Sequence, residues 1–103
     1  MAQANHAPLT FYQEEAAKKL TNYMRKRYRR QGFTGWADLD GVLLNARRME
    51  NVGRQDAVQA ALYSQYRGGN RFRVWWGNDP FSPDGTQYFI SLSPHLHTNK
   101  DGN

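Results

Sequence analysis

Apolar residues recur with helical spacing in the first part of the chain. Over residues 10–30 they fall on one side of a helix drawn at about 100° per residue, with Lys and Arg on the other side. Thr10 and Gln13 have the spacing of a capping box, and Gly32 is a stop signal. The pattern predicts a long amphipathic helix. Its inward positions are Ala16, Ala17, Leu20, Met24 and Tyr28.

Two shorter helices are predicted to follow a short extended link at residues 33–36. The first, over residues 37–48, has apolar positions at i, i+3, i+4 and i+7. These positions are Leu39, Val42, Leu43 and Ala46. Residues 50–53 interrupt the pattern, and residues 54–66 resume it. The inward positions of this third helix are Ala57, Val58, Ala61 and Leu62.

After Gly68-Gly69-Asn70 the period of the pattern changes from helical to alternating. Residues 71–76 and 87–92 alternate and are rich in aromatic and β-branched residues, which is typical of strands. The intervening loop at residues 77–85 contains the turn signal Pro83-Asp84-Gly85. The predicted fold class is therefore α+β, with three helices followed by a β-hairpin.

The whole pattern fits one domain over residues 10–93, because 103 residues leave no room for a second core. Residues 1–9 are expected to be a disordered lead-in, and residues 94–103 a flexible tail. No apolar run is long enough to span a membrane, and residues 1–8 do not resemble a secretory signal. The expected location is the cytoplasm.

The order of elements over residues 10–93 resembles the winged helix-turn-helix superfamily. The resemblance implies that the extended link can join the hairpin as a third strand. It also implies that the hairpin loop is the wing and that the third helix reads nucleic acid. The segment Gly35-Trp36-Ala37-Asp38-Leu39 is similar to the small winged lobe that precedes the catalytic lobe of tRNA 2′-phosphotransferases. That catalytic lobe is absent here, so the similarity implies no activity.

The distribution of charge along the chain favours a negatively charged partner. The formal net charge is +5, and thirteen of the fourteen Lys and Arg lie within residues 16–73. Such a concentration is typical of a surface that binds a polyanion, although a well-solvated face that keeps a small protein soluble would look the same. The chain has no cysteine, which excludes disulfides, thiol nucleophiles and Cys-ligated metals.

Two motifs suggest other chemistry and fail for physical reasons. Asp38-Leu39-Asp40-Gly41-Val42-Leu43 resembles the first motif of haloacid-dehalogenase-type phosphatases. That chemistry needs a buried parallel strand before the first Asp, and later Ser or Thr, Lys and paired-carboxylate motifs around a metal. Residues 31–36 cannot form such a strand, no doubly wound sheet fits downstream, and Lys100 is the only lysine after Asp40. His95 and His97 flank Leu96, but no cysteine and no nearby carboxylate pattern supports a metal site there. We therefore expect no catalytic site, no metal and no cofactor.

The third helix and the hairpin carry the candidate binding residues. Arg54, Gln55 and Gln59 lie in the N-terminal half of the helix and are expected to contact base edges. Tyr63 and Tyr66 share that outward arc, and the loop residue Phe81 is expected at the wing tip. Phosphate contacts, with Trp75 stacking beside them, are expected from Lys18, Arg25, Arg29, Arg47, Arg48, Arg67, Arg71 and Arg73.

These expectations describe a non-enzymatic domain that binds double-stranded DNA as a small regulator or accessory factor. They require the helix-three edge and the neighbouring cations to form one continuous surface, so that Arg73→Ala weakens binding to all sequences alike. One alternative is RNA binding through the Arg and Trp face of the hairpin. Another is a protein-interaction module of phage or mobile-element type, which binds and modulates a host protein such as a nucleic-acid enzyme. Its anchors would be Tyr63, Tyr66, Trp75 and Phe81.

Overall fold

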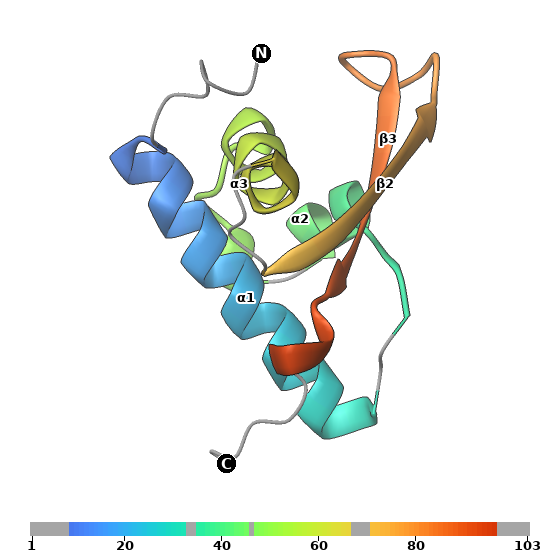
Figure 1. The fold of residues 1–103 in the computed structure, drawn as a ribbon. Helices are drawn as coiled ribbons and strands as arrows, with labels where there is room; N and C mark the ends of the chain where they lie inside the picture. Colours follow the sequence, from blue (N-terminus) through green and yellow to red (C-terminus); the bar gives the residue numbers. More distant parts are fainter. Residues whose placement is uncertain (1–8, 33–34, 46, 67–70, 97–103) are drawn as a thin grey trace.

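The computed structural model describes residues 9–32, 35–45, 47–66 and 71–96 (Figure 1). It is an α+β structure in which helices precede most of a three-stranded antiparallel sheet, so the predicted fold class is confirmed at that level. The elements are α1 (Phe11–Gln31), β1 (Ala37–Asp38), α2 (Leu39–Asn45), the 3₁₀ helix η2 (Arg47–Met49), α3 (Arg54–Tyr66), β2 (Phe72–Asn78), β3 (Thr86–Leu92) and the 3₁₀ helix η3 (Pro94–Leu96).

Local signals determine both ends of α1. The Thr10 side chain accepts a hydrogen bond from the backbone of Gln13, and the Gln13 side chain accepts one from the backbone of Thr10. Gly32 ends the helix in the left-handed region at φ 65°, where its N–H donates to the carbonyl of Tyr28. A residue with a Cβ is strained at that angle, which explains the glycine.

The second helix begins later than the sequence pattern predicts. Ala37 and Asp38 pair with Ile90 and Phe89 of β3, so they form an edge strand instead of the first turn of a helix. The helix starts at Leu39 and ends at Asn45. A 3₁₀ helix, η2, replaces the predicted last turn, and Ala46 lies outside the described residues.

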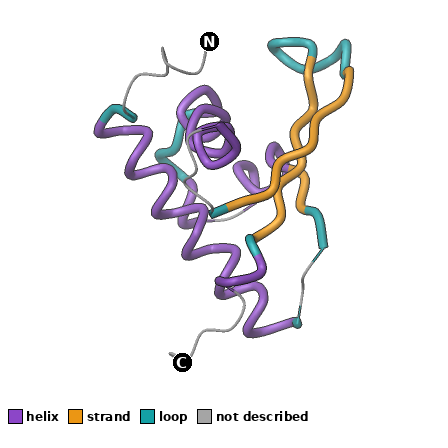
Figure 2. The backbone as a smooth tube through the Cα atoms, in the orientation of Figure 1, coloured by secondary structure: helices purple, strands orange, loops and turns teal. Residues whose placement is uncertain are grey.

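The predicted hairpin is present, and β1 extends it in the strand order β1-β3-β2. Alternation divides the sheet into two faces: Phe72 and Val74 of β2 are buried, whereas Arg73 and Trp75 between them are exposed. The buried face packs on α1, α2 and α3. The hairpin twists, and its loop end extends beyond the helices (Figure 2).

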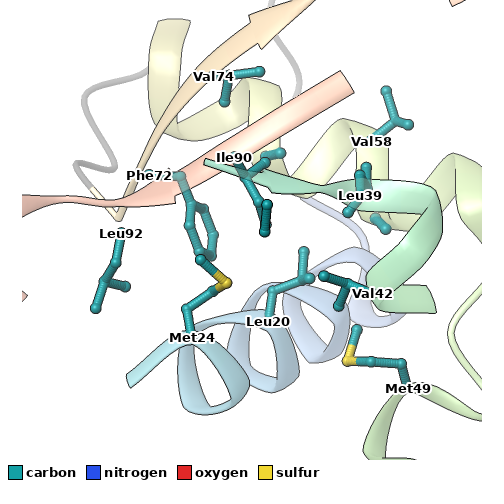
Figure 3. Close-up of a cluster of buried hydrophobic side chains, with 13 residues drawn as sticks. Leu20, Met24, Leu39, Val42, Met49, Val58, Phe72, Val74, Ile90 and Leu92 are labelled. Carbon is teal, nitrogen blue, oxygen red and sulfur yellow. The ribbon is translucent and has the colours of Figure 1, made fainter. Parts of the chain in front are cut away.

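The core lies between this inner sheet face and the helices (Figure 3). Met24 of α1 points toward Phe72, Leu20 lies beside it in the same cluster, and Ile90 of the central strand is fully buried there. A second, smaller cluster joins the N-terminal half of α1 to α3. It consists of Ala16, Ala17 and Ala60.

Past the sheet, Leu96 of η3 packs against the core, within the segment expected to be a flexible tail. Residues 1–8 and 97–103 lie outside the described residues, and with them most of the expected lead-in and tail. Among the described helices, none combines the length and the apolar character that crossing a bilayer requires.

Candidate nucleic-acid interface

Helix α3 presents two glutamines to solvent. Gln55 and Gln59 are both exposed and lie one turn apart in the N-terminal half of the helix. The opposite side of the same turns is in the core, where Ala57, Val58 and Ala61 are buried. One side of α3 therefore packs in the core while the side with Gln55 and Gln59 is exposed to solvent, as the sequence pattern predicts.

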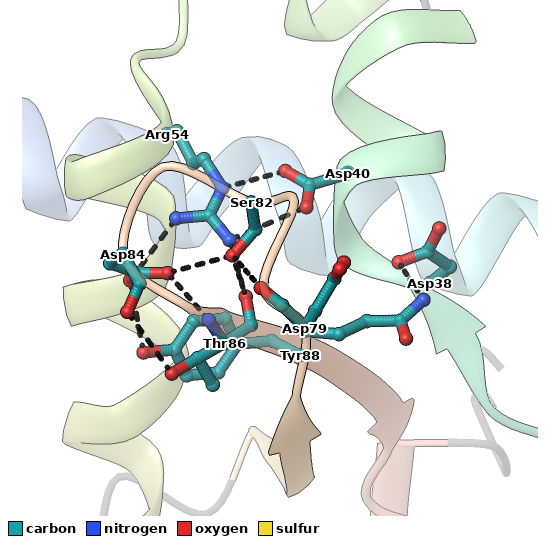
Figure 4. Close-up of polar contacts among 9 residues, drawn as sticks. Asp38, Asp40, Arg54, Asp79, Ser82, Asp84, Thr86 and Tyr88 are labelled. Atoms are coloured by element: carbon teal, nitrogen blue, oxygen red, sulfur yellow. Dashed lines mark hydrogen bonds and ion pairs between the residues drawn. The ribbon is translucent and has the colours of Figure 1, made fainter.

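Arg54, the first residue of α3, joins three elements (Figure 4). Its Nε donates to Oδ1 of Asp40 in α2 at 2.7 Å, and its Nη2 lies 3.3 Å from Oδ2 of the same carboxylate. Nη2 also donates to the carbonyl of Thr86 at 2.9 Å, and Nη1 pairs with Oδ2 of Asp84 at 3.1 Å. With a side chain only 19% exposed, Arg54 connects α2, α3 and the base of the hairpin loop.

The hairpin loop is itself ordered by short-range hydrogen bonds. The N–H of Asp79 donates to the carbonyl of Gly85 at 2.9 Å, and the Ser82 hydroxyl donates to the carbonyl of Thr86 at 2.9 Å. Gly85 has a φ of 75°, which confirms the turn expected there and explains why glycine occupies it. At the tip, Phe81 is 94% exposed.

The contacts between Arg54 and the base of the hairpin loop shift the pKa values of three groups. The hydrogen bond to Asp40 raises the pKa of Arg54 despite the desolvation of the guanidinium, so the cation is permanent. Desolvation raises the pKa of Asp84, but hydrogen bonds from Arg54 and from the backbone of Thr86 outweigh it and hold that pKa below 3.8. Desolvation, followed by the negative charge of Asp84, raises the pKa of Tyr88.

The lowered pKa of Asp84 predicts a loss of stability in acid. A carboxylate with a depressed folded-state pKa stabilises the protein fully above its unfolded-state pKa, here about 3.8. That contribution is lost as the pH falls through the folded-state pKa. Urea midpoints measured at about pH 6 and about pH 2.5 should therefore fall less for Asp84→Asn than for the wild type. Equal falls would contradict this role of Asp84.

The structure changes the role of one predicted base-contacting residue. The sequence pattern places Arg54 among the base readers with Gln55 and Gln59. In the structure its guanidinium nitrogens are bound to Asp40, Asp84 and a backbone carbonyl. We therefore count Arg54 among the residues that build the candidate site, and only Gln55 and Gln59 remain candidates for base contacts.

The expected continuous cationic surface is divided between several sides of the molecule. Arg73 and Trp75 project from the outer face of the sheet, whereas α3 packs on the inner face through residues opposite Gln55 and Gln59. The hairpin loop at residues 79–85 does not link the outer sheet face to α3 with positive charge, because its only charged residues are the acidic Asp79 and Asp84.

The basic residues of α1 form a third surface. Asn22, Arg25, Lys26 and Arg29 line one hollow on this helix. At about 100° per residue they lie opposite Ala16 and Ala17, which pack toward α3. Lys18, on the same outer side, pairs with Glu15 at 3.6 Å. The expected contribution of Lys18, Arg25 and Arg29 to a duplex bound at α3 therefore loses its geometric basis.

The remaining candidates are placed as follows. Arg47 is exposed in η2, shortly before α3. Tyr63 and Arg71 are partly buried and have interactions within the protein. The side chains of Arg48 and Tyr66, and the whole of Arg67, lie outside the described residues.

Sequence reasoning missed two groups of residues. Asp40 and Asp84 hold Arg54, although 14 and 30 positions separate them from it, so no local pattern signals the contact. Trp36 and Phe89 join Trp75 on the outer sheet face. Their alternation with the buried Ala37 and Ile90 is a usable signal, but only once the register of β1 with β3 is known.

The phosphatase-like motif is divided between a strand and a helix. Asp38 ends the two-residue strand β1, and Asp40 is bound to Arg54 in the first turn of α2. Within residues 9–32, 35–45, 47–66 and 71–96, no group of three or more His, Asp or Glu is placed to hold a metal ion.

Comparison with protein-family models, curated proteins and solved structures finds no match for this chain.

Proposed function

We propose that this chain is a nucleic-acid-binding domain of the winged-helix type and that its ligand is double-stranded DNA. The connectivity supports the proposal: a helix, an edge strand, two helices and a hairpin follow one another, and the edge strand joins the sheet beside β3. The winged-helix resemblance implies that arrangement, with α3 as the reading helix and the loop at residues 79–85 as the wing.

The observation that carries the proposal is the exposure of Gln55 and Gln59 on a helix whose opposite side is buried at Ala57, Val58 and Ala61. A glutamine amide can bind adenine through two hydrogen bonds in the major groove, which is wide enough to admit an α-helix. Recognition helices of helix-turn-helix proteins use their N-terminal residues for such contacts. Both glutamines lie in that half of α3.

The loop beside α3 contributes shape and not charge. Arg54 fixes its base against the start of α3, and its charged residues are Asp79 and Asp84. Phe81 at the tip is an apolar side chain of the kind that enters a minor groove and unstacks a base step. Phosphate contacts near α3 then fall to exposed cations such as Arg47.

Selection from a random duplex library, followed by anisotropy titration, tests this proposal. Gln55→Ala should weaken binding to the selected duplex by about 5- to 150-fold, because a bidentate contact carries about 1–3 kcal/mol of discrimination. Binding to a random duplex should change little, because phosphate contacts do not read sequence.

Two control variants make the result specific. Gln31→Ala removes another exposed glutamine, at the end of α1, and Arg73→Ala removes a cation from the outer sheet face. Both should leave the affinity for the selected duplex within about twofold, since Gln31 is the last residue of α1, far along that helix from its contact with α3, and Arg73 lies on the outer face of the sheet. Failure of selection to enrich any duplex, or equal losses for Gln55→Ala on both duplexes, would contradict the proposal.

A protein-interaction module is the second candidate, and a specific observation favours it. Phe81 is 94% exposed at the tip of the hairpin loop, and aromatic side chains such as Phe are enriched where proteins bind one another. Binding of this kind depends weakly on salt, whereas duplex binding falls steeply with salt. A discrete protein complex that survives high salt and is lost in Phe81→Ser, without any duplex binding, would favour this candidate.

A further inference from the structure

An aromatic hollow lies on the outer face of the sheet, on the side away from α3. Trp36, Trp75 and Phe89 line it, and its volume is about 380 Å³. Trp36 is 46% exposed and Trp75 is 57% exposed, so the rings offer their surfaces to a ligand. The volume is in the lower part of the range, about 300–1,000 Å³, that small-molecule pockets occupy.

Strand register builds the hollow from two rows of side chains. Asp38, Phe89 and Trp75 form one row across β1, β3 and β2, with the rings of Trp75 and Phe89 5.1 Å apart between centroids. In the other row Arg73 is opposite Ser91, and Trp36 lies one residue before the start of β1. The hollow is thus a product of the sheet itself and not of a loop.

A cation is held at the rim of the hollow. The guanidinium carbon of Arg73 lies 5.3 Å from the centroid of the Trp36 ring, and Nη2 donates to the Ser91 hydroxyl at 3.2 Å. Ser91 is fully buried at this point. The Arg73 cation on Trp36 attracts an anion to that end of the hollow, whereas the Asp38 carboxylate, across Phe89 from Trp75, accepts a hydrogen bond from the Gln87 amide at 3.4 Å.

We propose that this hollow binds single-stranded nucleic acid, with an unpaired base stacked on Trp75 and Phe89 and its phosphate near Arg73. Base–aromatic stacking combined with a basic side chain is the usual means by which proteins hold single strands. Bases inside a duplex are already stacked and cannot enter. The site is therefore separate from the duplex site proposed on α3, and it faces the opposite way.

The probe is a labelled oligothymidylate of about 12 nucleotides, titrated by anisotropy beside an abasic strand of equal length and charge. The wild type should bind the thymidylate more tightly than the abasic strand. Trp75→Ala should weaken thymidylate binding at least about tenfold and leave abasic binding nearly unchanged. Equal wild-type affinities for the two strands, or no binding to either, would overturn the proposal.

Trp76→Ala is the matched control, because Trp76 is the next residue in β2, is 44% exposed and lies outside the hollow. Its thymidylate affinity should stay within about twofold of the wild type. Saturating thymidylate should quench indole fluorescence in the wild type and in Trp76→Ala, but much less in Trp75→Ala. Equal losses of affinity in both tryptophan variants would overturn the assignment to this face.

Failure of this proposal is distinguishable from failure of the duplex proposal. Gln55→Ala should leave thymidylate affinity unchanged, and Trp75→Ala should leave affinity for the selected duplex unchanged. Loss of both affinities in Trp75→Ala, with urea midpoints like the wild type, would mean one shared site and would overturn the separation. Urea midpoints for every variant establish that each is folded.

Discussion

Truncation of Ile90 to alanine is expected to destabilise the protein by about 3 kcal/mol, the middle of the range for emptying a fully buried site. Ile90 is fully buried in the central strand, opposite Ala37 of β1 and Val74 of β2. Its side chain contacts the inner cluster that joins the sheet to α1 and α2, so its removal leaves a cavity at the centre of the fold. Urea unfolding at neutral pH measures the loss.

Leu44→Ala supplies the comparison, since Leu44 is an exposed leucine in α2. Its unfolding free energy should differ from the wild type by no more than about 0.5 kcal/mol, as is usual for surface positions. A similar loss in the two variants would mean that Ile90 is not central to the core. Since single domains have only about 5–15 kcal/mol of stability, Ile90→Ala should also lower the temperature at which both proposed binding activities persist.

The periodicity of apolar residues predicts α1 and α3, because each of these helices buries apolar side chains along one side. The predicted third helix matches α3, and α1 ends one residue beyond its approximate expected end. Both helices carry short-range signals that act within a few residues, such as the capping box at Thr10 and the glycine at position 32. Such signals depend on neighbouring residues alone, so the sequence is sufficient to place them.

The start of α2 depends on a distant strand and was predicted wrongly. Ala37 is a strong helix former and Asp38 suits a first helical turn, so the local sequence fits a helix start as well as an edge strand. The choice between them is made by hydrogen bonds to β3, more than fifty residues later in the chain. A short apolar run therefore cannot be assigned from its own pattern.

Which exposed residues share one surface also depends on contacts between distant parts of the chain. Alternation correctly separates Arg73 and Trp75 from Phe72 and Val74, but it does not say which face of the sheet lies beside α3. The expectation of one continuous cationic surface assumes that basic residues close together in the sequence also lie on the same side of the molecule. Packing of α3 on the inner sheet face separates them. The candidate site thus divides into a glutamine edge and an aromatic hollow.

Replacement of Arg54 with methionine has the second largest expected effect, a loss of about 2 kcal/mol of unfolding free energy. Hydrogen bonds to charged groups contribute about 1.5–3 kcal/mol, and the partial exposure of Asp40 and Asp84 lets water compensate for some of the loss. Methionine retains most of the apolar stem. Urea unfolding measures the total effect, and hydrogen exchange locates it: the amides of Asp79 and Gly85 should exchange faster as the loop loses its tether.

The same variant decides between the two roles considered for Arg54. If the arginine connects α2, α3 and the loop, Arg54→Met should lose stability and speed loop exchange, and Arg54→Lys should restore only part of both. A lysine keeps the charge but cannot reach Asp40, Asp84 and the Thr86 carbonyl with a planar fork. If the arginine instead reads a base, Arg54→Met should leave stability within about 0.5 kcal/mol and broaden the set of duplexes that selection enriches. Because the three contacts use the guanidinium within the protein, we expect the first result.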